Sequence, residues 1–477
     1  DICLPELPDV VEYGYKENKE TSGENEMRIP IGLYDDPDNR IQEEAYLNIS
    51  KENTIIIGAS LFGKTYFLQL VIRSIAELFT AEEVNIYILD FGSMSLRIFS
   101  RLNHIGAVML PGEDERIRHF FKFMSKERMS RKVRFAKLGM TSFHSYKEAG
   151  YTDIPQIVIM IDDLISFKEQ YPDYHEELTT ICREGISLGI CVIAAASQVS
   201  GIGYRYLNTF AYKIALCCNS STEYGMIFDR CRIEPKAVPG RTLICIEKEM
   251  YEMQLYLAFP GKCEADRIKE IEAFISQRNI ENKGIEAQAV PEIPLHPDDE
   301  YIKNNYKQTD IFKIPIGIDH ESVELVEMDL KRTISVAVSG RQCREKENLI
   351  YMILDHLCSK AFIYPPKIFI IDGYERRLKS YYDNGYIEGY TTEADETETI
   401  LLSFEEKLKE RKSIVRANGF KAIEDEPLLV CVIENPEIFE SRAISEKVSS
   451  VYRRIVENYK RFKAVIIFSD VPNIKSG

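Results

Sequence analysis

The chain has 477 residues, of which 45% are hydrophobic and 29% are charged, so it can form the cores of two to four globular domains. Its formal net charge of −16 disfavours a protein whose main task is to hold nucleic acid. The eleven scattered cysteines disfavour a disulfide framework or a zinc site, and no apolar run reaches the roughly 18 residues needed to cross a bilayer.

The first strong motif follows the apolar run Thr54–Ile57, which predicts a short buried strand. The next eight residues fit the phosphate-loop pattern GxxxxGK[ST] in full, and an amphipathic segment to about Phe79 predicts the helix that must follow. We therefore predict that a nucleoside triphosphate, ATP, is bound by Gly58, Ala59, Ser60, Leu61, Phe62, Gly63, Lys64 and Thr65.

Each residue type that this pattern specifies has a chemical reason. Gly58 and Gly63 let the backbone curl so that successive N–H groups face phosphate oxygens. Lys64 adds a positive charge near the β- and γ-phosphates, and the Thr65 hydroxyl is a hard oxygen ligand for Mg²⁺. The helix directs its positive N-terminal end at the same anion.

A second apolar run, Gln156–Ile161, predicts a buried strand that ends in Asp162 and Asp163. We expect Asp162 to hold Mg²⁺ together with Thr65, and Asp163 to orient or deprotonate the attacking water. A turn or helix-capping role at the end of the strand is the alternative for these acids. Asp163 is one methylene shorter than a Glu, and a general base displaced by about 1 Å can cost roughly 10²-fold in rate.

The run Ile190–Ala196 predicts a further strand, followed by Ser197 and Gln198. Gln198 is a candidate sensor of the γ-phosphate, although Ser-Gln after a strand is also ordinary turn chemistry. The candidate catalytic residues are Lys64, Asp162, Asp163 and Gln198.

The chain also contains an internal duplication. Gly58, Lys64 and Asp90 match Gly340, Lys346 and Asp372 at a constant offset of 282 residues, and Pro-Glu-rich and Ile-Pro-Ile-Gly segments precede both copies. Apolar strands alternate with helices in each copy, which predicts an α/β fold of tandem RecA-like P-loop (ASCE) domains with mostly parallel sheets flanked by helices. We expect an N-terminal linker (1–26), a first domain (27–278), a second linker (279–310) and a second, degenerate and truncated domain (311–477).

The second copy has lost the phosphate-loop chemistry. Glu345 stands where the first copy has Gly63, and Glu347 stands where it has Thr65, so two carboxylates face the place of phosphate and Mg²⁺. The acidic strand Leu429–Ile433 ends in Glu434 and Asn435. We predict that the second domain does not hydrolyse ATP and serves a regulatory or binding role.

These residues resemble the FtsK/SpoIIIE family of motor ATPases, on the segments Ile29–Leu33, Ile161–Leu164 and Gly189–Gln198. The tandem arrangement, with Leu-Pro-Glu-Leu-Pro at residues 4–8, is similar to the ATPases of type VII (ESX) secretion systems, the EssC/EccC proteins, over nearly the whole chain. The resemblance implies a membrane-associated motor of which this chain, which begins at Asp1 and not at Met, is a cytoplasmic piece.

The resemblance further implies export of small WXG100-type proteins, contact with other secretion-system subunits and assembly into hexamers. One departure concerns an arginine that acts on the neighbouring subunit in many relatives: Gly225 falls at that position here, with Arg230, Arg232 and Arg241 as nearby substitutes. A trans arginine can be worth 10³–10⁵ in rate, so we expect slow or conditional turnover. A DNA translocase and a non-hydrolysing ATP-binding scaffold are the alternatives.

Overall fold

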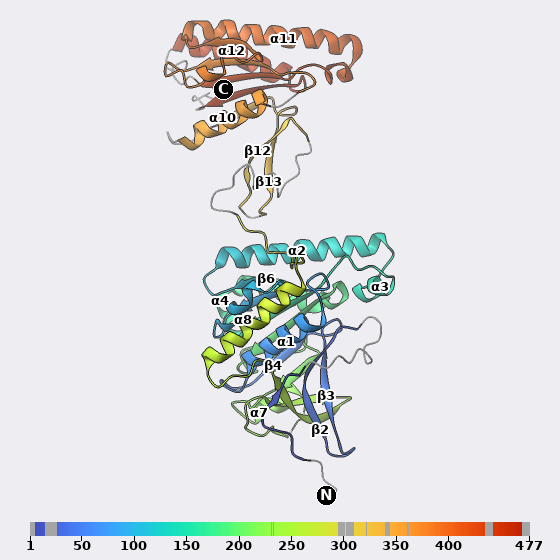
Figure 1. Ribbon diagram of the computed structural model, residues 1–477. Helices are drawn as coiled ribbons and strands as arrows, with labels where there is room; N and C mark the ends of the chain where they lie inside the picture. Colours follow the sequence, from blue (N-terminus) through green and yellow to red (C-terminus); the bar gives the residue numbers. More distant parts are fainter. Residues whose placement is uncertain are drawn as a thin grey trace. The chain divides into compact units, whose positions relative to one another are not determined.

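The computed structural model describes residues 5–14, 26–229, 231, 233–293, 301, 310–320, 322–338, 344–359, 362–434 and 442–469. The chain divides into two compact units, Asp1–Glu292 and Ile293–Gly477 (Figure 1). No helix in the described ranges combines the length and apolarity needed to cross a membrane.

The first unit is built on one long mixed sheet in the order β3-β2-β11-β10-β9-β4-β8-β7-β5-β6. The strands from β9 to β6 are parallel, whereas β10, β11, β2 and β3 continue the sheet in antiparallel pairs. Its strands are β1 (Val11–Glu12, paired with β11), β2 (Arg28–Asp36), β3 (Ile41–Asn48), β4 (Thr54–Ile57), β5 (Val84–Asp90), β6 (Ile105–Met109), β7 (Gln156–Asp162), β8 (Ile190–Ala196), β9 (Tyr212–Ala215), β10 (Arg241–Ile246) and β11 (Glu249–Leu257).

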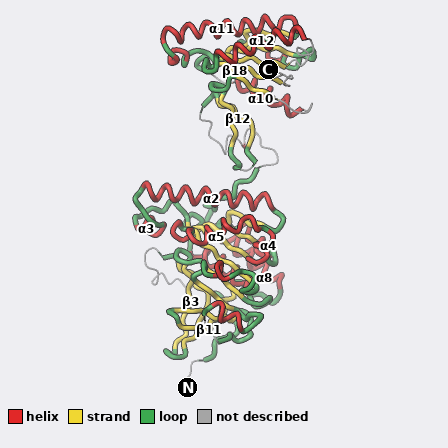
Figure 2. The backbone as a smooth tube through the Cα atoms, turned by 180° about the vertical axis from the view of Figure 1, so that it is seen from behind, coloured by secondary structure: helices red, strands yellow, loops and turns green. Residues whose placement is uncertain are grey.

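Helices cover both faces of this sheet (Figure 1, and from behind in Figure 2), so its central parallel strands are apolar on both sides. Along β4, for example, Ile55 and Ile57 pack toward α2, α4 and α5, while Ile56 packs toward α1 and α8. The helices are α1 (Lys64–Leu78), α2 (Asp114–Lys137), α3 (Phe143–Glu148), α4 (Leu164–Gln170), α5 (His175–Glu184), α6 (Tyr204–Leu207), α7 (Thr222–Ile227) and α8 (Glu264–Glu281), with short 3-10 turns η1 (Ser95–Arg101), η2 (Pro172–Tyr174) and η3 (Ile186–Leu188).

The second unit has a five-stranded parallel sheet in the order β14-β18-β17-β15-β16 and a separate hairpin, β12-β13. Helix α10 packs on one face of the sheet, and α11 and α12 pack on the other. The elements are β12 (Lys313–Ile318), β13 (Leu325–Asp329), β14 (Ser335–Val338), α10 (Arg344–Ser359), β15 (Lys367–Asp372), η4 (Lys379–Tyr381), β16 (Ile387–Thr391), η5 (Ala394–Glu396), α11 (Thr397–Asn418), η6 (Phe420–Ile423), β17 (Leu429–Glu434), α12 (Arg442–Asn458) and β18 (Ala464–Ser469).

The predicted α/β fold of tandem, mostly parallel domains is confirmed. In the first unit β8 lies between the phosphate-loop strand β4 and the acidic strand β7, which is the RecA-like order. In the second unit β18 lies in the same way between β14 and β17.

Matching side chains in the two units show the duplication at the level of single hydrogen bonds. Asp90 ends β5 and accepts a hydrogen bond from the backbone N–H of Leu96 at 2.9 Å. Asp372 ends β15 and accepts one from the N–H of Leu378, also at 2.9 Å. Both carboxyls therefore fix the turn that follows the strand they end, β5 in the first unit and β15 in the second.

The two segments predicted as linkers are partly integrated into the first unit. Residues 11–12 form β1, and Leu7 is only 4% exposed. The second linker was expected to start at 279, but α8 continues to Glu281, and Val290 is 5% exposed in the core of the first unit. These segments are polar and proline-rich overall, so their single buried apolar residues, Leu7 and Val290, do not stand out in the composition. The first compact unit ends at Glu292.

Candidate nucleotide-binding site

The phosphate loop runs from the end of β4 to the start of α1, as its sequence predicts. A Cβ at Gly58 would lie 2.5 Å from the Leu216 Cβ, and Gly63 has a φ of +115°, so both positions need glycine. The loop is tied to neighbouring strands because the Gly58 N–H donates to the Ala196 carbonyl at 3.2 Å and the Ala59 N–H donates to the Cys217 carbonyl at 2.7 Å.

Lys64 lies inside the curl of this loop. Its Nζ donates to the carbonyl oxygens of Gly58 at 2.8 Å and Ala59 at 2.9 Å. Burial lowers the pKa of Lys64, an effect that Asp162 and Asp163 oppose. The ammonium group is thus held at the loop, where a phosphate chain would neutralise it.

Thr65 and Asp162, the predicted Mg²⁺ ligands, are in contact. The Thr65 Oγ1 donates to the Asp162 Oδ2 at 3.1 Å, and Asp162 is 2% exposed at the end of β7. Burial, with a smaller contribution from the neighbouring carboxyl of Asp90, raises the pKa of Asp162 to about 6, and the hydrogen bond from Thr65 opposes this shift. A buried carboxyl beside a hydroxyl is a hard oxygen pair that a divalent cation would stabilise, so these residues fit Mg²⁺.

Asp163 directly follows β7 and stands at the N-terminus of α4. It has a φ of 61°, in the left-handed region, and it caps α4. Its carboxylate accepts from the Ser166 N–H at 3.3 Å and from the Ser166 Oγ at 2.6 Å. The candidate general base is thus engaged by its own helix.

A cavity of about 920 Å³ opens over the loop and contains most of the predicted site. The loop, α1 and the end of β7 contribute Ser60, Leu61, Gly63, Lys64, Thr65, Asp162 and Asp163 to its lining. Gln198 is exposed and lies outside this lining, and Ser197 takes the expected place at the end of β8. Gly58, Ala59 and Phe62 of the loop are also outside the lining.

Two further elements line the cavity that sequence reasoning missed. The turn after β5 contributes Gly92 to Ser95, and α8 contributes Glu264 and Arg267. A Cβ at Gly92 would lie 2.6 Å from the Asp162 Oδ2, which is a local reason for glycine there. Arg267 stacks over the Tyr66 ring at 5.6 Å, but nothing in its sequence surroundings relates it to a loop 200 residues earlier.

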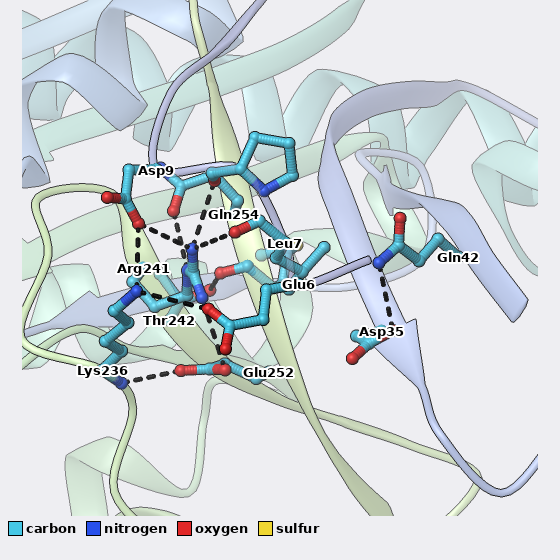
Figure 3. A network of polar contacts seen from close by, with 12 residues as sticks. Glu6, Leu7, Asp9, Asp35, Gln42, Lys236, Arg241, Thr242, Glu252 and Gln254 are labelled. Atoms are coloured by element: carbon cyan, nitrogen blue, oxygen red, sulfur yellow. Dashed lines mark hydrogen bonds and ion pairs between the residues drawn. The ribbon is translucent and has the colours of Figure 1, made fainter. Parts of the chain in front are cut away.

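The candidate substitutes for the missing arginine differ in their surroundings. Arg241 is 2% exposed, and its guanidinium is occupied by Gln254 Oε1 at 2.8 Å and the Leu7 carbonyl at 2.9 Å (Figure 3). Both contacts hold the guanidinium inside its own unit. Arg230 and Arg232 lie outside the described residues.

In the second unit the loop equivalent to the phosphate loop, residues 339–343, lies outside the described residues, as do the side chains of Glu345, Lys346 and Glu347 and the whole of Asn435. Glu434 is described and is 7% exposed at the end of β17. The Arg377 Nη1 lies 3.9 Å from its Oε1. A guanidinium therefore stands near the position that Asp162 takes in the first unit.

The strand order and the site together define a RecA-like P-loop nucleotide-binding protein. Residues 17–215 match the model of the FtsK/SpoIIIE family. The first unit therefore contains a P-loop ATPase domain that matches the FtsK/SpoIIIE family model, and the chain is homologous to the EssC/EccC ATPases of type VII secretion systems.

Three relatives show the extent of this likeness. The ESX secretion system protein EccC of Geobacillus thermodenitrificans is 27% identical over 365 residues, which are 74% of this chain and 24% of that protein. The ESX secretion system protein YukB of Bacillus subtilis is 25% identical over 364 residues, 76% of this chain and 24% of the relative. The type VII secretion system protein EssC of Staphylococcus aureus strain MRSA252 is 24% identical over 441 residues, 88% of this chain and 28% of the relative. The chain thus spans about a quarter of their length.

Solved structures share the fold. ATPases 2 and 3 of EssC from G. thermodenitrificans superpose with a TM-score of 0.78 at 24% identity, covering 98% of this chain and 87% of that one. ATPases 2 and 3 of EccC from Thermomonospora curvata, in complex with a signal sequence peptide, give a TM-score of 0.64 at 19% identity, with 98% and 85% covered.

Proposed function

We propose that the first unit binds ATP with Mg²⁺ and hydrolyses it slowly, as one nucleotide-dependent stage of a type VII protein secretion motor. The observation that carries this proposal is the geometry at Lys64, Thr65 and Asp162, in which a lysine inside a complete phosphate loop adjoins a buried carboxyl and hydroxyl pair. The secretion role rests on homology to proteins that are named for that system.

The residues divide the chemistry among them. The N–H groups of Ser60 to Lys64 and the Lys64 ammonium would hold the phosphate chain, and Thr65 and Asp162 would hold the metal. Bound Mg²⁺ supplies charge neutralisation for the phosphates. Asp163 would orient the attacking water, but only after its carboxylate leaves Ser166. Gln198 would sense the γ-phosphate only after a movement toward the cavity.

The engagement of Asp163 favours a second candidate function, a unit that holds ATP and does not hydrolyse it. A carboxylate that caps α4 and accepts a 2.6 Å bond from the Ser166 Oγ is a poor base in this conformation. Both functions place ATP at the same loop, and they differ in the rate of phosphate release.

For the second unit we propose a non-catalytic role, either regulatory or in binding an exported protein. Glu434 is buried with Arg377 nearby, so a protein cation partly neutralises the acidic position of this unit. A relative of similar fold binds a signal sequence peptide, which supports small WXG100-type proteins as the exported class. We further propose a cytoplasmic location, contact with other secretion subunits and assembly as a hexamer.

The test compares ATP hydrolysis by the wild-type chain, Lys64→Ala and Asp163→Glu, and export in cells that carry each variant. We expect slow hydrolysis by the wild type, none by Lys64→Ala and at least a several-fold rise in Asp163→Glu, because the longer carboxylate reaches further toward the phosphate. Lys64→Ala should also abolish export. Undiminished export with Lys64→Ala would contradict the motor proposal. No hydrolysis in Asp163→Glu would favour the holding function, and hydrolysis stimulated by added DNA would favour a DNA translocase.

A further inference from the structure

A second, smaller cavity adjoins the phosphate loop at Gly63, and Asp162 is not among the residues that line it. Its volume is about 240 Å³, below the roughly 300–1,000 Å³ typical of sites that hold a whole small ligand. It shares Gly63, Tyr66 and Arg267 with the larger cavity, so the two spaces meet beside the loop. The small cavity therefore suits a part of a ligand whose remainder lies over the loop.

The chemistry of the two cavities differs. The large cavity carries the carboxylates of Asp162, Asp163 and Glu264. The small one is lined mainly by apolar and backbone groups from α1, the turn before β10 and β11, including the Tyr66 and Tyr256 residues. An aromatic heterocycle binds more favourably in the small cavity than in the large one, because stacking and apolar contact do not require a charge.

One wall of the small cavity comes from the opposite end of the unit's sequence. Asp9, Val10 and Val11 line it, and Val11 pairs in parallel with Tyr256 of β11. The Tyr13 N–H continues this pairing with a 3.0 Å bond to the Leu257 carbonyl. The segment 7–13 is thus an added edge on β11 that closes the cavity.

Arg241 holds this segment in place (Figure 3). Its Nη2 donates to the carbonyls of Leu7 at 2.9 Å and Pro8 at 3.2 Å and lies 3.5 Å from the Asp9 Oδ1. Because the guanidinium is 2% exposed, few other partners are open to it in the folded unit. The contact between Arg241 and the segment is accordingly specific.

The backbone of the residue that precedes Arg241 is bonded to the phosphate loop. Gly240, the residue before it, donates its N–H to the Phe62 carbonyl of the loop at 2.9 Å. A Cβ at Gly63 would lie 3.5 Å from the Gly240 nitrogen. Movement of the Arg241 turn would therefore disturb the loop as well as the segment 7–13.

We propose that the small cavity receives the nucleoside part of ATP and that the segment 7–13 is its detachable wall, so that nucleotide binding and docking of this segment strengthen each other. This inference rests on the proposed function, since it assumes ATP at the loop. The segment lies at the N-terminal side of the first unit. Its docking would depend on whether ATP is bound, and a protein or domain in contact with the segment would respond to that difference. By linkage, each event changes the affinity of the other by the same factor.

The experiment uses the full chain and two ligands, ATP and inorganic tripolyphosphate, both with Mg²⁺. Leu7→Ala removes a buried anchor of the segment that lies outside both cavities, and Glu12→Ala, an exposed position of the same segment, is the matched control. We expect Leu7→Ala to weaken ATP affinity by about five-fold or more, the lower end of typical coupling, and to leave tripolyphosphate affinity unchanged. Glu12→Ala should leave both unchanged.

Hydrogen exchange of the wild-type chain supplies a readout that needs no variant. Exchange of the Tyr13 amide should slow with ATP and should not slow with tripolyphosphate. Equal ATP affinity in the wild type and Leu7→Ala, a parallel loss for both ligands, or unchanged Tyr13 exchange would overturn the coupling while the nucleotide site stands. Binding of neither ligand by the wild type would refute the proposed function and the coupling with it.

Discussion

At the end of β7 the Asp162 carboxyl is 2% exposed. Its ionised form is unfavourable in the nucleotide-free fold and would be stabilised by a bound metal. Burial raises its pKa from 3.8 to about 6, so the folded chain favours the protonated form. This group therefore favours folding below pH 3.8, and its contribution is lost as the pH rises through about 6. A functional group that costs stability is common at binding sites.

Asp162→Asn should consequently stabilise the nucleotide-free chain at pH 7. A pKa raised from 3.8 to about 6 corresponds to at most about 3 kcal/mol, since each unit is worth about 1.36 kcal/mol. The measurement is thermal or urea unfolding of both proteins at pH 7 and near pH 4. The difference between them should shrink at the lower pH, and a wild type that is the more stable at pH 7 would refute the argument.

At the scale of elements, α2 directs a buried arginine to the turn before β8, and α11 directs one to the turn before β18. The Arg131 Nη1 donates to the Leu188 carbonyl at 2.8 Å and the Gly189 carbonyl at 3.1 Å. The Arg411 Nη1 donates to the Phe462 carbonyl at 2.7 Å and the Lys463 carbonyl at 2.8 Å. Both units thus use a buried arginine to hold a helix against the turn before a strand: α2 before β8, and α11 before β18.

Arg131→Ala should destabilise the first unit by about 3–5 kcal/mol, because it leaves Glu127 and two buried carbonyls without their partner. Hydrogen exchange should speed up at β8 and stay unchanged at β18. Arg411→Ala is the matched variant and should show the reverse. Equal acceleration at both strands in either variant would show that these contacts are not local fastenings.

Elements differed in how far the sequence could predict them. The phosphate loop was predictable because its chemistry fixes residue types within eight consecutive positions. The strands β4, β7 and β8 were predictable because strands buried on both faces are continuous apolar runs. The capping role of Asp163 depends on a left-handed backbone that the sequence does not encode visibly. The contributions of Arg267 and of the segment 7–13 depend on contacts between residues more than 190 positions apart, which no local pattern carries.

For the whole molecule, our central proposal is that the chain holds two domains of common origin and that the first one alone has a working nucleotide site. The first unit keeps Lys64, Thr65 and Asp162 together, whereas the acidic position of the second unit, Glu434, has Arg377 nearby. Fold was retained in both copies, and the residues that hold phosphate and metal were retained in one. This pattern supports our proposal that the second unit has a non-catalytic role, either regulatory or in binding an exported protein.

Equilibrium titration of the full chain with labelled ATP, with and without Mg²⁺, tests this claim most directly. Lys64→Ala removes the ammonium of the first site and leaves the second unit intact. The account predicts one Mg²⁺-dependent ATP per wild-type chain and none for Lys64→Ala. Two sites per chain, or a Mg²⁺-dependent site that survives Lys64→Ala, would contradict it.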